Sequence, residues 1–283
     1  MPPRPALGRA KPDPRFYSTM TAFLMCPPDY YGIEYEINPW MDLRRQADPK
    51  MAKRQWESLY DLLKNRLHVR VELIEPVKGL PDMVFTANGG LIFENDCILA
   101  SLRHPERRGE SPHFEKWFKG CGYQVHTLPS DCFFEGAGDG LFLGENLFGG
   151  YRMRSDVQAH RIISELLGKR VLSLELVDEH FYHLDTCFCP LDHERALYYP
   201  LAFDEPARKV IQQFVPKPLP VSDADALQFG CNAIVIRENV VLHYGCEELK
   251  AMLIGEGFLV HELDFSEFLK AGGSAKCLTL RIE

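Results

Sequence analysis

The sequence predicts an α/β fold in which five ββαβ units surround a pseudo-fivefold axis. The first observation behind this prediction is a residue, polar in four cases and cysteine in the last, that precedes an apolar strand five times along the chain. These residues are spaced 51, 46, 47 and 45 residues apart, close to a constant period. Such self-similarity is typical of repeated supersecondary units. The five residues are Asn88, Asp139, Asp185, Asn232 and Cys277.

The second observation is that an amphipathic helix and one further strand follow the hairpins. Hairpins are expected over residues 88–100, 139–149, 185–199 and 232–242, and a single strand over 277–282. Helices are expected to begin near Pro49, Pro112, Asp156, Glu205 and Glu247, four of them after a good capping residue. The following strands are expected at 69–73, 123–127, 171–174, 218–221 and 258–261, the fourth weakened by its prolines.

The last unit has no returning strand of its own. Residues 18–25 form an apolar segment that we expect to pair beside 277–282 and close the ring, because closure removes exposed sheet edges. The sequence therefore predicts a single domain over residues 18–283. Residues 1–17, rich in Pro, Arg and Ala, are expected to form a poorly ordered arm.

Charge and cysteine content narrow the class of function. The net charge of -8 argues against a nucleic-acid partner, and no apolar run approaches the length of a membrane span. The nine cysteines show no disulfide framework, and no signal peptide precedes them, so reduced thiols and a cytoplasmic location are expected. The expected partner is a small cationic molecule, and homo-oligomerisation stays open.

The five repeated residues indicate a site for a flat cation. Equivalent units would bring them together at the axis, where Asp139 and Asp185 supply carboxylates that can grip a guanidinium group. Cys277 supplies a thiol that can attack its central carbon. The alternative is that the Asx residues cap turns and that Cys277 is a buried hydrophobe. The place of Cys277 in the series favours a nucleophilic thiol over a buried hydrophobic side chain.

Proton transfer near neutral pH calls for a histidine. His183 lies two residues before Asp185, so an extended segment would point both side chains to one face. Glu135 lies upstream of Asp139 in a glycine-rich bend, where it would bind substrate or orient another group. Cys187 and Cys189 raise zinc as an alternative, but no second pair stands at ligand spacing. We expect neither metal nor cofactor.

Four segments carry a resemblance to a known superfamily: PDMVFTANGG at 81–90, FEGAGD at 134–139, HLDT at 183–186 and GGSAKCLTLRI at 272–282. At these residues the chain resembles the guanidino-group-modifying enzymes of the pentein, or α/β-propeller, fold, and the resemblance extends from about Ser18 onward. It implies that Cys277 attacks the guanidinium carbon to give a covalent thiouronium intermediate. It also implies that His183 protonates the leaving nitrogen and then activates water, while Asp139 and Asp185 hold the substrate.

The chain departs from two branches of that superfamily. Asn88 stands where arginine deiminases and dimethylarginine hydrolases carry an acidic residue, and Met153 stands where deiminases place a glutamate. Residues 85–90 and 150–156 are similar instead to the cyanobacterial arginine dihydrolase domain, which converts arginine to ornithine, carbon dioxide and two ammonia.

By this second resemblance Asn88 contacts the substrate and tunes whether citrulline leaves or is attacked again. Arg107 and Arg154 would bind the α-carboxylate, with Arg103 in reserve. The competing functions are an arginine deiminase that stops at citrulline, a hydrolase of N-omega-methylated arginine and an amidinotransferase. A binding protein that uses the same ring without catalysis, as ribosome anti-association initiation factors do, is the competitor from another class.

Overall fold

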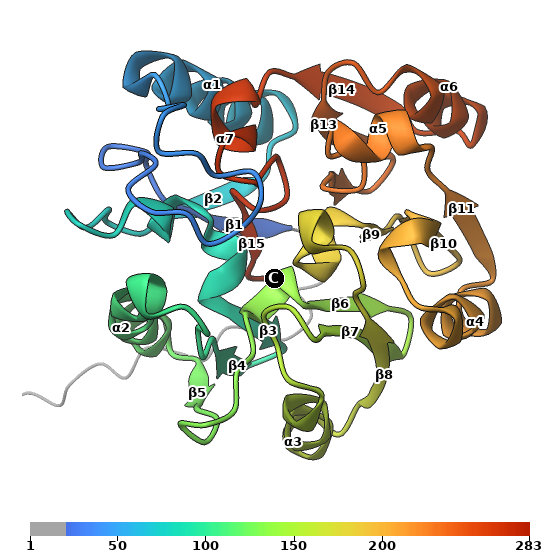
Figure 1. Cartoon of the computed structure of the whole chain (residues 1–283), viewed down its shortest axis with the longest axis horizontal. Coiled ribbons are helices and arrows are strands. Elements are labelled where there is room, and N and C mark those ends of the chain that lie inside the picture. The colour runs from blue at the N-terminus through green and yellow to red at the C-terminus, as the bar shows by residue number, and fades with distance from the viewer. Residues whose placement is uncertain (1–20) are drawn as a thin grey trace, which may run out of the picture.

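The structure is a computed structural model that describes residues 21–283, and it belongs to the α/β class (Figure 1). It contains five three-stranded sheets, and in each the middle strand pairs antiparallel with one neighbour and parallel with the other. In sheet order the strands are β15 (Leu280–Arg281), β1 (Ala22–Met25) and β2 (Arg70–Leu73); β3 (Gly90–Phe93), β4 (Asp96–Leu99) and β5 (Gln124–His126); β6 (Gly140–Leu143), β7 (Asn146–Tyr151) and β8 (Arg170–Glu175); β11 (Lys217–Pro220), β10 (Arg195–Tyr198) and β9 (Phe188–Pro190); and β12 (Ile234–Ile236), β13 (Asn239–His243) and β14 (Leu259–Leu263).

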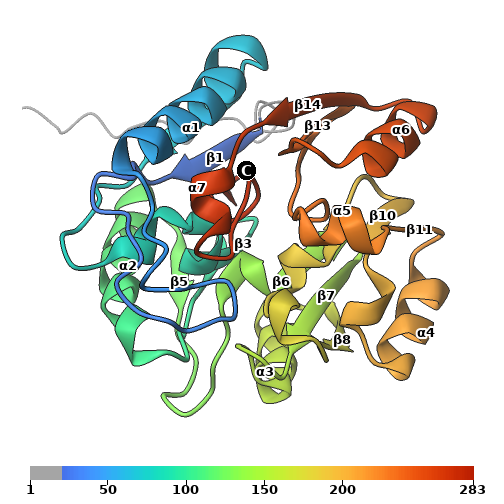
Figure 2. The ribbon, with the colours of Figure 1, turned by 45° about the horizontal axis from the view of Figure 1, so that its top comes forward.

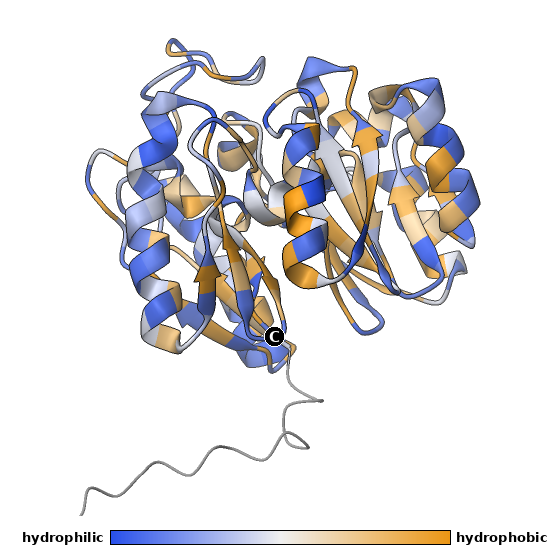
Figure 3. Ribbon diagram, turned by 90° about the horizontal axis from the view of Figure 1, so that it is seen from below, coloured by the Kyte–Doolittle hydropathy of each residue, from blue (hydrophilic) through white to orange (hydrophobic). Residues whose placement is uncertain are grey.

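The helices flank the sheets, with hydrophilic residues on their outer faces and apolar residues along the strands (Figure 3). They are α1 (Pro49–Asp61), α2 (Ser111–Cys121), α3 (Val157–Leu167), α4 (Glu205–Phe214), α5 (Asp223–Leu227), α6 (Glu247–Gly255) and α7 (Ser266–Leu269). Among the described residues, none of these helices has the length and apolar content needed to cross a bilayer.

The predicted order of two hairpin strands, a helix and a third strand is confirmed in four sheets, where the second hairpin strand pairs with the strand after the helix. The proline-rich strand β11 pairs parallel with β10, with Pro218 opposite Ala196 and Pro220 opposite Tyr198. It tolerates both prolines because it is the edge strand of its sheet, where a missing N–H leaves no central ladder bond broken. The predicted pairing of the N-terminal segment with the last unit is also confirmed, since Phe23 pairs with Arg281 and Leu24 with Leu280. The two strands lie side by side in Figure 1, and Figure 2 shows β1 beside α1 and α7.

Residues 18–20 of that segment and the expected arm, 1–17, lie outside the described residues.

The strand expected over 277–282 is wrong in its first half. Only Leu280–Arg281 forms a strand, and Cys277 lies in a turn. The backbone curls there because the amides of Ser274 and Cys277 both donate to Asn232 Oδ1, at 3.2 Å each.

The expected extended segment at His183 is also wrong, because Leu184–Thr186 forms a short 3-10 helix. Two helix starts shift by one residue. Ser111 is the first residue of α2 and not its cap, and α3 begins after Asp156, at Val157. The Asp156 carboxylate does not cap that helix because it accepts from the amide of Phe133 and pairs with Arg103.

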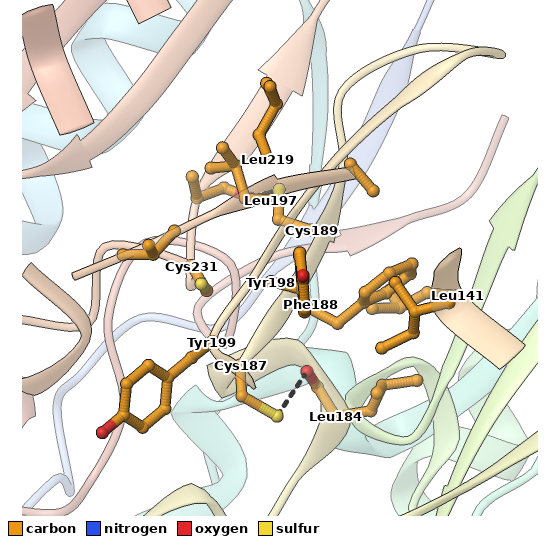
Figure 4. Close-up of a cluster of buried hydrophobic side chains, with 14 of the residues drawn as sticks. Leu141, Leu184, Cys187, Phe188, Cys189, Leu197, Tyr198, Tyr199, Leu219 and Cys231 are labelled. Atoms are coloured by element: carbon orange, nitrogen blue, oxygen red, sulfur yellow. Dashed lines mark hydrogen bonds between the residues drawn. The ribbon is translucent and has the colours of Figure 1, made fainter. Parts of the chain in front are cut away.

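A hydrophobic cluster supports the turn that follows β8 (Figure 4). Leu184 is fully buried in it, and the Cys187 thiol lies 3.5 Å from the Leu184 carbonyl oxygen. Cys189 lies instead 3.6 Å from the carbonyl oxygen of Ala233, so the two thiols of the Cys-Phe-Cys segment have different partners. Over residues 21–283, no three His, Cys, Asp or Glu side chains group as metal ligands do. The cluster fixes the turn that carries His183 and Asp185.

Candidate active site

The five repeated residues occupy the same place in their units, just before the first strand of a sheet. Asn88 lies within a 3-10 turn before β3, Asp139 follows one before β6 and Asp185 lies within one before β9. Asn232 and Cys277 precede β12 and β15 in turns without a regular helix. All five side chains are buried.

One pocket brings together five of the nine predicted site residues, namely Asn88, Arg107, Arg154, His183 and Cys277. Its polar lining consists of Asn38, Asp82, Asn88, Arg107, Arg154, Tyr182, His183 and Cys277. Ile37, Asn38 and Met41, from the segment between β1 and α1, cover it, and Asn38 Nδ2 donates to the Ala271 carbonyl at 3.1 Å. The cavity volume is about 10 Å³, close to that of one water probe. A molecule as large as an amino acid therefore fits only if residues around the cavity move apart.

The Cys277 sulfur lies against a carboxylate and an amide. Its distances to Asp185 are 3.5 Å to Oδ2 and 3.7 Å to Oδ1, and Asn232 Nδ2 donates to it at 3.1 Å. Burial raises the pKa of the Cys277 thiol well above its usual value, and the adjacent Asp185 carboxylate raises it further. Burial also raises the pKa of Asp185, to about 6, against the opposing charge of Lys276. The resting thiol is therefore protonated.

The imidazole of His183 is held by Glu135. The distance from His183 Nε2 to Glu135 Oε2 is 2.7 Å, and Arg154 Nη1 donates to the same oxygen at 3.1 Å. Burial alone would raise the pKa of Glu135, but the charge of Arg154 and the hydrogen bond from His183 outweigh it and hold that pKa below its usual value. Glu135 is fully buried and does not line the pocket. Of the two roles expected for it, the geometry favours orientation of His183.

Asp139 does not line the pocket either. Its carboxylate accepts from Ser155 Oγ at 2.5 Å and from the backbone amide of Leu184 at 3.0 Å. Burial raises the pKa of Asp139 to about 6, and His183 and Ser155 oppose that rise. Because Leu184 stands between His183 and Asp185, the structure places Asp139 as an anchor of the turn that carries them. Asp185 does not line the pocket either, so the grip of Asp139 and Asp185 on one ligand stays a prediction.

The three predicted arginines differ in how many of their five N–H groups are already engaged. Arg107 uses four, in bonds to Glu110 Oε1 and Oε2, Asn88 Oδ1 and the Asp82 carbonyl. Arg154 uses two, to Glu135 and the Ile37 carbonyl, and stacks on the Tyr182 ring at 4.6 Å. Arg103 lies outside the pocket, where it binds the Arg154 carbonyl and Asp156. Of the two arginines that line the pocket, Arg154 thus has more donors left than Arg107.

The carboxamide of Asn88 has a defined orientation. Arg107 Nη1 donates to Asn88 Oδ1 at 2.9 Å, and an arginine can only donate, so the other end of the amide carries the N–H groups. Asn88 Nδ2 in turn donates to the Glu135 carbonyl at 3.3 Å. One N–H of the two on Nδ2 is left for the pocket.

Asp82 is a pocket residue that the repeat does not select. It stands upstream of Asn88, outside the five-residue series, and no spacing rule points to it. Its Oδ2 lies 3.7 Å from Arg107 Nε, and its buried Oδ1 completes no hydrogen bond within residues 21–283. The buried Tyr35 hydroxyl completes no hydrogen bond among them either, but it lies near enough to Asp82 to favour its charged form. Burial raises the pKa of Asp82, and Arg107 and the nearby Tyr35 hydroxyl oppose the rise.

In sequence and in fold the chain is similar to known enzymes that act on arginine or on methylated arginine. The sequence profile of the family described as N,N dimethylarginine dimethylhydrolase, eukaryotic, matches residues 34–283. The chain is 47% identical to the bifunctional arginine dihydrolase/ornithine cyclodeaminase AgrE of Nostoc sp., over 92% of this chain and 37% of that protein. It is 44% identical to the N(G),N(G)-dimethylarginine dimethylaminohydrolase of Mycobacterium tuberculosis, over 92% of this chain and 85% of that protein. The chain thus spans little more than a third of the length of the bifunctional relative.

Among solved structures, the N-terminal domain of ArgZ, an arginine dihydrolase from the cyanobacterial ornithine-ammonia cycle, superposes with a TM-score of 0.89. That structure is a cysteine-to-serine variant bound to substrate, with 44% identity over 93% of this chain and 98% of that one. A dimethylarginine dimethylaminohydrolase at 21% identity superposes with a TM-score of 0.81, over 93% of this chain and 100% of that one, and is similar in fold.

Proposed function

Since the chain belongs to the N,N-dimethylarginine dimethylhydrolase family, we propose that it hydrolyses the guanidinium group of L-arginine, with Cys277 as nucleophile and His183 as general acid/base. The observation that carries the proposal is one pocket lined by both residues, with a buried carboxylate of Asp185 3.5 Å from the sulfur. The 47% identity to a relative named for arginine dihydrolase supports arginine as the substrate.

The first half of the reaction follows from the charges at the sulfur. A guanidinium cation beside Asp185 would favour the thiolate, because a nearby positive charge stabilises the anionic form of a thiol. The thiol proton passes to His183, the sulfur bonds to the guanidinium carbon, and His183 gives that proton to the terminal nitrogen as its bond to carbon breaks and ammonia leaves. The product is a thiouronium on Cys277.

The second half releases the sulfur. His183 takes a proton from water, the water oxygen bonds to the thiouronium carbon, and the carbon–sulfur bond breaks to give citrulline. On the ureido group the same two steps release the second ammonia and then free the sulfur from an S-thiocarbamate, which leaves an N-carboxy form of ornithine. Its bond between nitrogen and the carboxy carbon then breaks to give ornithine and carbon dioxide. Overall, one arginine and two waters give one ornithine, one carbon dioxide and two ammonia.

Asn88 supports this second round. A guanidinium ion has only N–H donors, whereas the ureido group of citrulline has an acceptor oxygen. The free N–H of Asn88 Nδ2 fits that oxygen, and Arg107 keeps it aimed. A carboxylate at this position would favour the cationic substrate over the neutral intermediate, and citrulline would leave sooner.

The rest of the pocket suits the α-amino acid end of the substrate. Arg154, with three N–H groups beyond its present bonds, would bind the α-carboxylate, and Arg107 would add one. The unpartnered oxygen of Asp82 would accept from the α-ammonium group. Asp139 and Ser155 would act through the Leu184 turn, without touching the substrate.

A hydrolase of methylated arginine is the second candidate. It is favoured by the relative from Mycobacterium tuberculosis, which this chain covers over 85% of its length. The same Cys277 and His183 would serve, with a methylamine as the leaving group in place of ammonia. Asn88 weighs against it, because a hydrolase that ends at citrulline and methylamine or dimethylamine has no need to retain citrulline.

We also infer that the five sheets are five repeats around a pseudo-fivefold axis in one domain. The equal pairing pattern of the sheets and their succession around the view in Figure 1 support this arrangement. The nine cysteines are all free, which supports a reducing compartment such as the cytoplasm.

A product assay tests the proposal. The protein is incubated separately with arginine, dimethylarginine and agmatine, and ornithine, citrulline, dimethylamine and ammonia are quantified. We expect ornithine and two ammonia per arginine consumed. Citrulline as the sole product would contradict the dihydrolase reading, and release of dimethylamine in preference to ammonia would favour the second candidate.

The variant Asn88→Asp is expected to turn arginine over with citrulline as the main product. The carboxylate keeps an acceptor for the cationic substrate but removes the N–H that would hold the ureido oxygen. The citrulline-to-ornithine ratio measures the effect, with Asn95→Asp, in the turn between β3 and β4, as the control. An unchanged ratio would show that Asn88 does not retain the intermediate.

We expect kcat/KM for arginine to fall tenfold for each pH unit below about 6, because a carboxyl with that pKa gains a proton there and loses the charge that attracts the guanidinium group. Asp139 has its pKa at about 6 as well, so the variants Asp185→Asn and Asp139→Asn are compared. Only Asp185→Asn should also raise KM strongly at neutral pH. A kcat/KM that stays constant down to about pH 5 would contradict either a pKa of about 6 for Asp185 or the need for its negative charge.

A further inference from the structure

Lys276, the residue before Cys277, carries a buried ammonium group with no hydrogen-bond partner in the described part of the chain. Its backbone is fixed, since its amide donates to the Asn232 carbonyl at 3.2 Å and its own carbonyl accepts from the Thr279 amide at 3.1 Å. An unpaired ammonium removed from water is costly, and such a group in a folded protein needs an explanation.

The ammonium acts on the nucleophile from outside the pocket. Lys276 is not a lining residue, yet its charge opposes the effect of burial on Asp185, and it also lowers the pKa of Cys277 and of Cys189 in β9. Asp185 is the carboxylate that touches the Cys277 sulfur. The positive charge therefore lies near the carboxylate and the thiol together.

The other charged groups that line the pocket with Cys277 either form ion pairs with a neighbouring residue or belong to the opposite wall. Arg107 is paired with Glu110, and Arg154 with Glu135. The remaining groups that face the thiol are Asp82, Tyr182 and His183, together with Asp185. Lys276 is thus the cation near the sulfur that forms no ion pair within residues 21–283.

We propose that Lys276 is a positioning residue whose fixed positive charge sustains the thiolate of Cys277 beside Asp185 during the second hydrolysis, when the substrate is neutral. This inference rests on the proposed function. In the first attack the guanidinium cation offsets the two adjacent negative charges. Citrulline brings no charge, so the counter-ions left for a buried thiolate next to a carboxylate are a protonated His183 and the ammonium of Lys276, and His183 loses its charge when it gives its proton to the leaving nitrogen.

Two measurements on Lys276→Met test this. The first is the rate at which iodoacetamide alkylates Cys277 in the substrate-free protein across pH, followed on the Cys277 peptide by mass spectrometry. We expect a rate about tenfold lower at neutral pH, the effect of one unit in the thiol pKa. The second is the product ratio from arginine, which should shift toward citrulline, while kcat for the consumption of arginine falls less than kcat for citrulline.

Lys276→Arg keeps the charge and should restore both readouts, and Lys209→Met, an exposed lysine on α4, is the matched control. If Lys276→Met does not fold, Lys276→Gln replaces it. The role of the charge would be overturned if Lys276→Met were alkylated with the same pH profile as the unmodified protein. It would also be overturned if Lys276→Arg lost as much alkylation rate as Lys276→Met. Alkylation needs no turnover, so it decides the role of Lys276 even if the unmodified protein stops at citrulline and the dihydrolase proposal fails.

Discussion

Replacement of Cys277 by serine is expected to lower kcat for arginine by about 10⁴-fold or more, because a hydroxyl is a far weaker nucleophile than a thiolate near neutral pH. Cys277 is the thiol that faces the pocket, with Asn232 and Asp185 holding its sulfur. Release of ammonia from arginine measures the loss. Binding should survive, since the guanidinium contacts expected of Asp185 are unchanged, and arginine should still raise the melting temperature of the variant.

The control for this variant is Cys121→Ser, the exposed cysteine at the end of α2, which should keep full activity. Turnover retained in Cys277→Ser would remove the thiouronium from the mechanism. Loss of both turnover and arginine binding would instead point to a collapsed site, which the thermal shift separates from loss of chemistry.

Replacement of His183 by asparagine is expected to lower kcat by a factor on the order of 10²–10⁴, the usual worth of a positioned general acid/base. Its imidazole is the pocket group that can give a proton to the leaving nitrogen and take one from water. Glu135→Gln should lower kcat by a smaller factor, because it weakens the 2.7 Å contact that orients the ring but leaves the ring in place. Steady-state rates for both variants measure the difference.

His193→Asn is the matched control, since His193 has a side chain 80% exposed. A Glu135→Gln variant as inactive as His183→Asn, with KM raised to the same extent, would indicate that Glu135 itself binds substrate. A fully active His183→Asn variant would assign the proton transfers to another group.

The sequence predicted the repeat because the repeat is a matter of spacing. Each unit places one residue before its first strand, and a regular interval in the chain therefore brings Asn88, Asp185 and Cys277 to equivalent places. The same logic located β11 despite its prolines. What spacing cannot give is the direction of a side chain. Asp139 occupies its expected place but turns to Ser155 and the Leu184 amide.

Residues outside the repeat escaped prediction for the same reason. Asp82 reaches the pocket from a segment with no counterpart in the series, and the covering segment around Asn38 has no signal in its composition. The turn at Cys277 was predicted as a strand because Leu278, Leu280 and Ile282 alternate as strand residues do. The chain curls there because the backbone amides of Ser274 and Cys277 donate hydrogen bonds to Asn232 Oδ1, a contact between distant parts of the chain.

The covalent bond between substrate and sulfur tests the central claim most directly. Arginine is mixed with the protein, the reaction is quenched with acid within one turnover, and the peptide that contains Cys277 is weighed by mass spectrometry. We expect a peptide heavier by the mass of arginine less ammonia, with the added mass on Cys277 and none in Cys277→Ser. Quantitative release of ammonia without any adduct on Cys277, or an adduct on another residue, would contradict it.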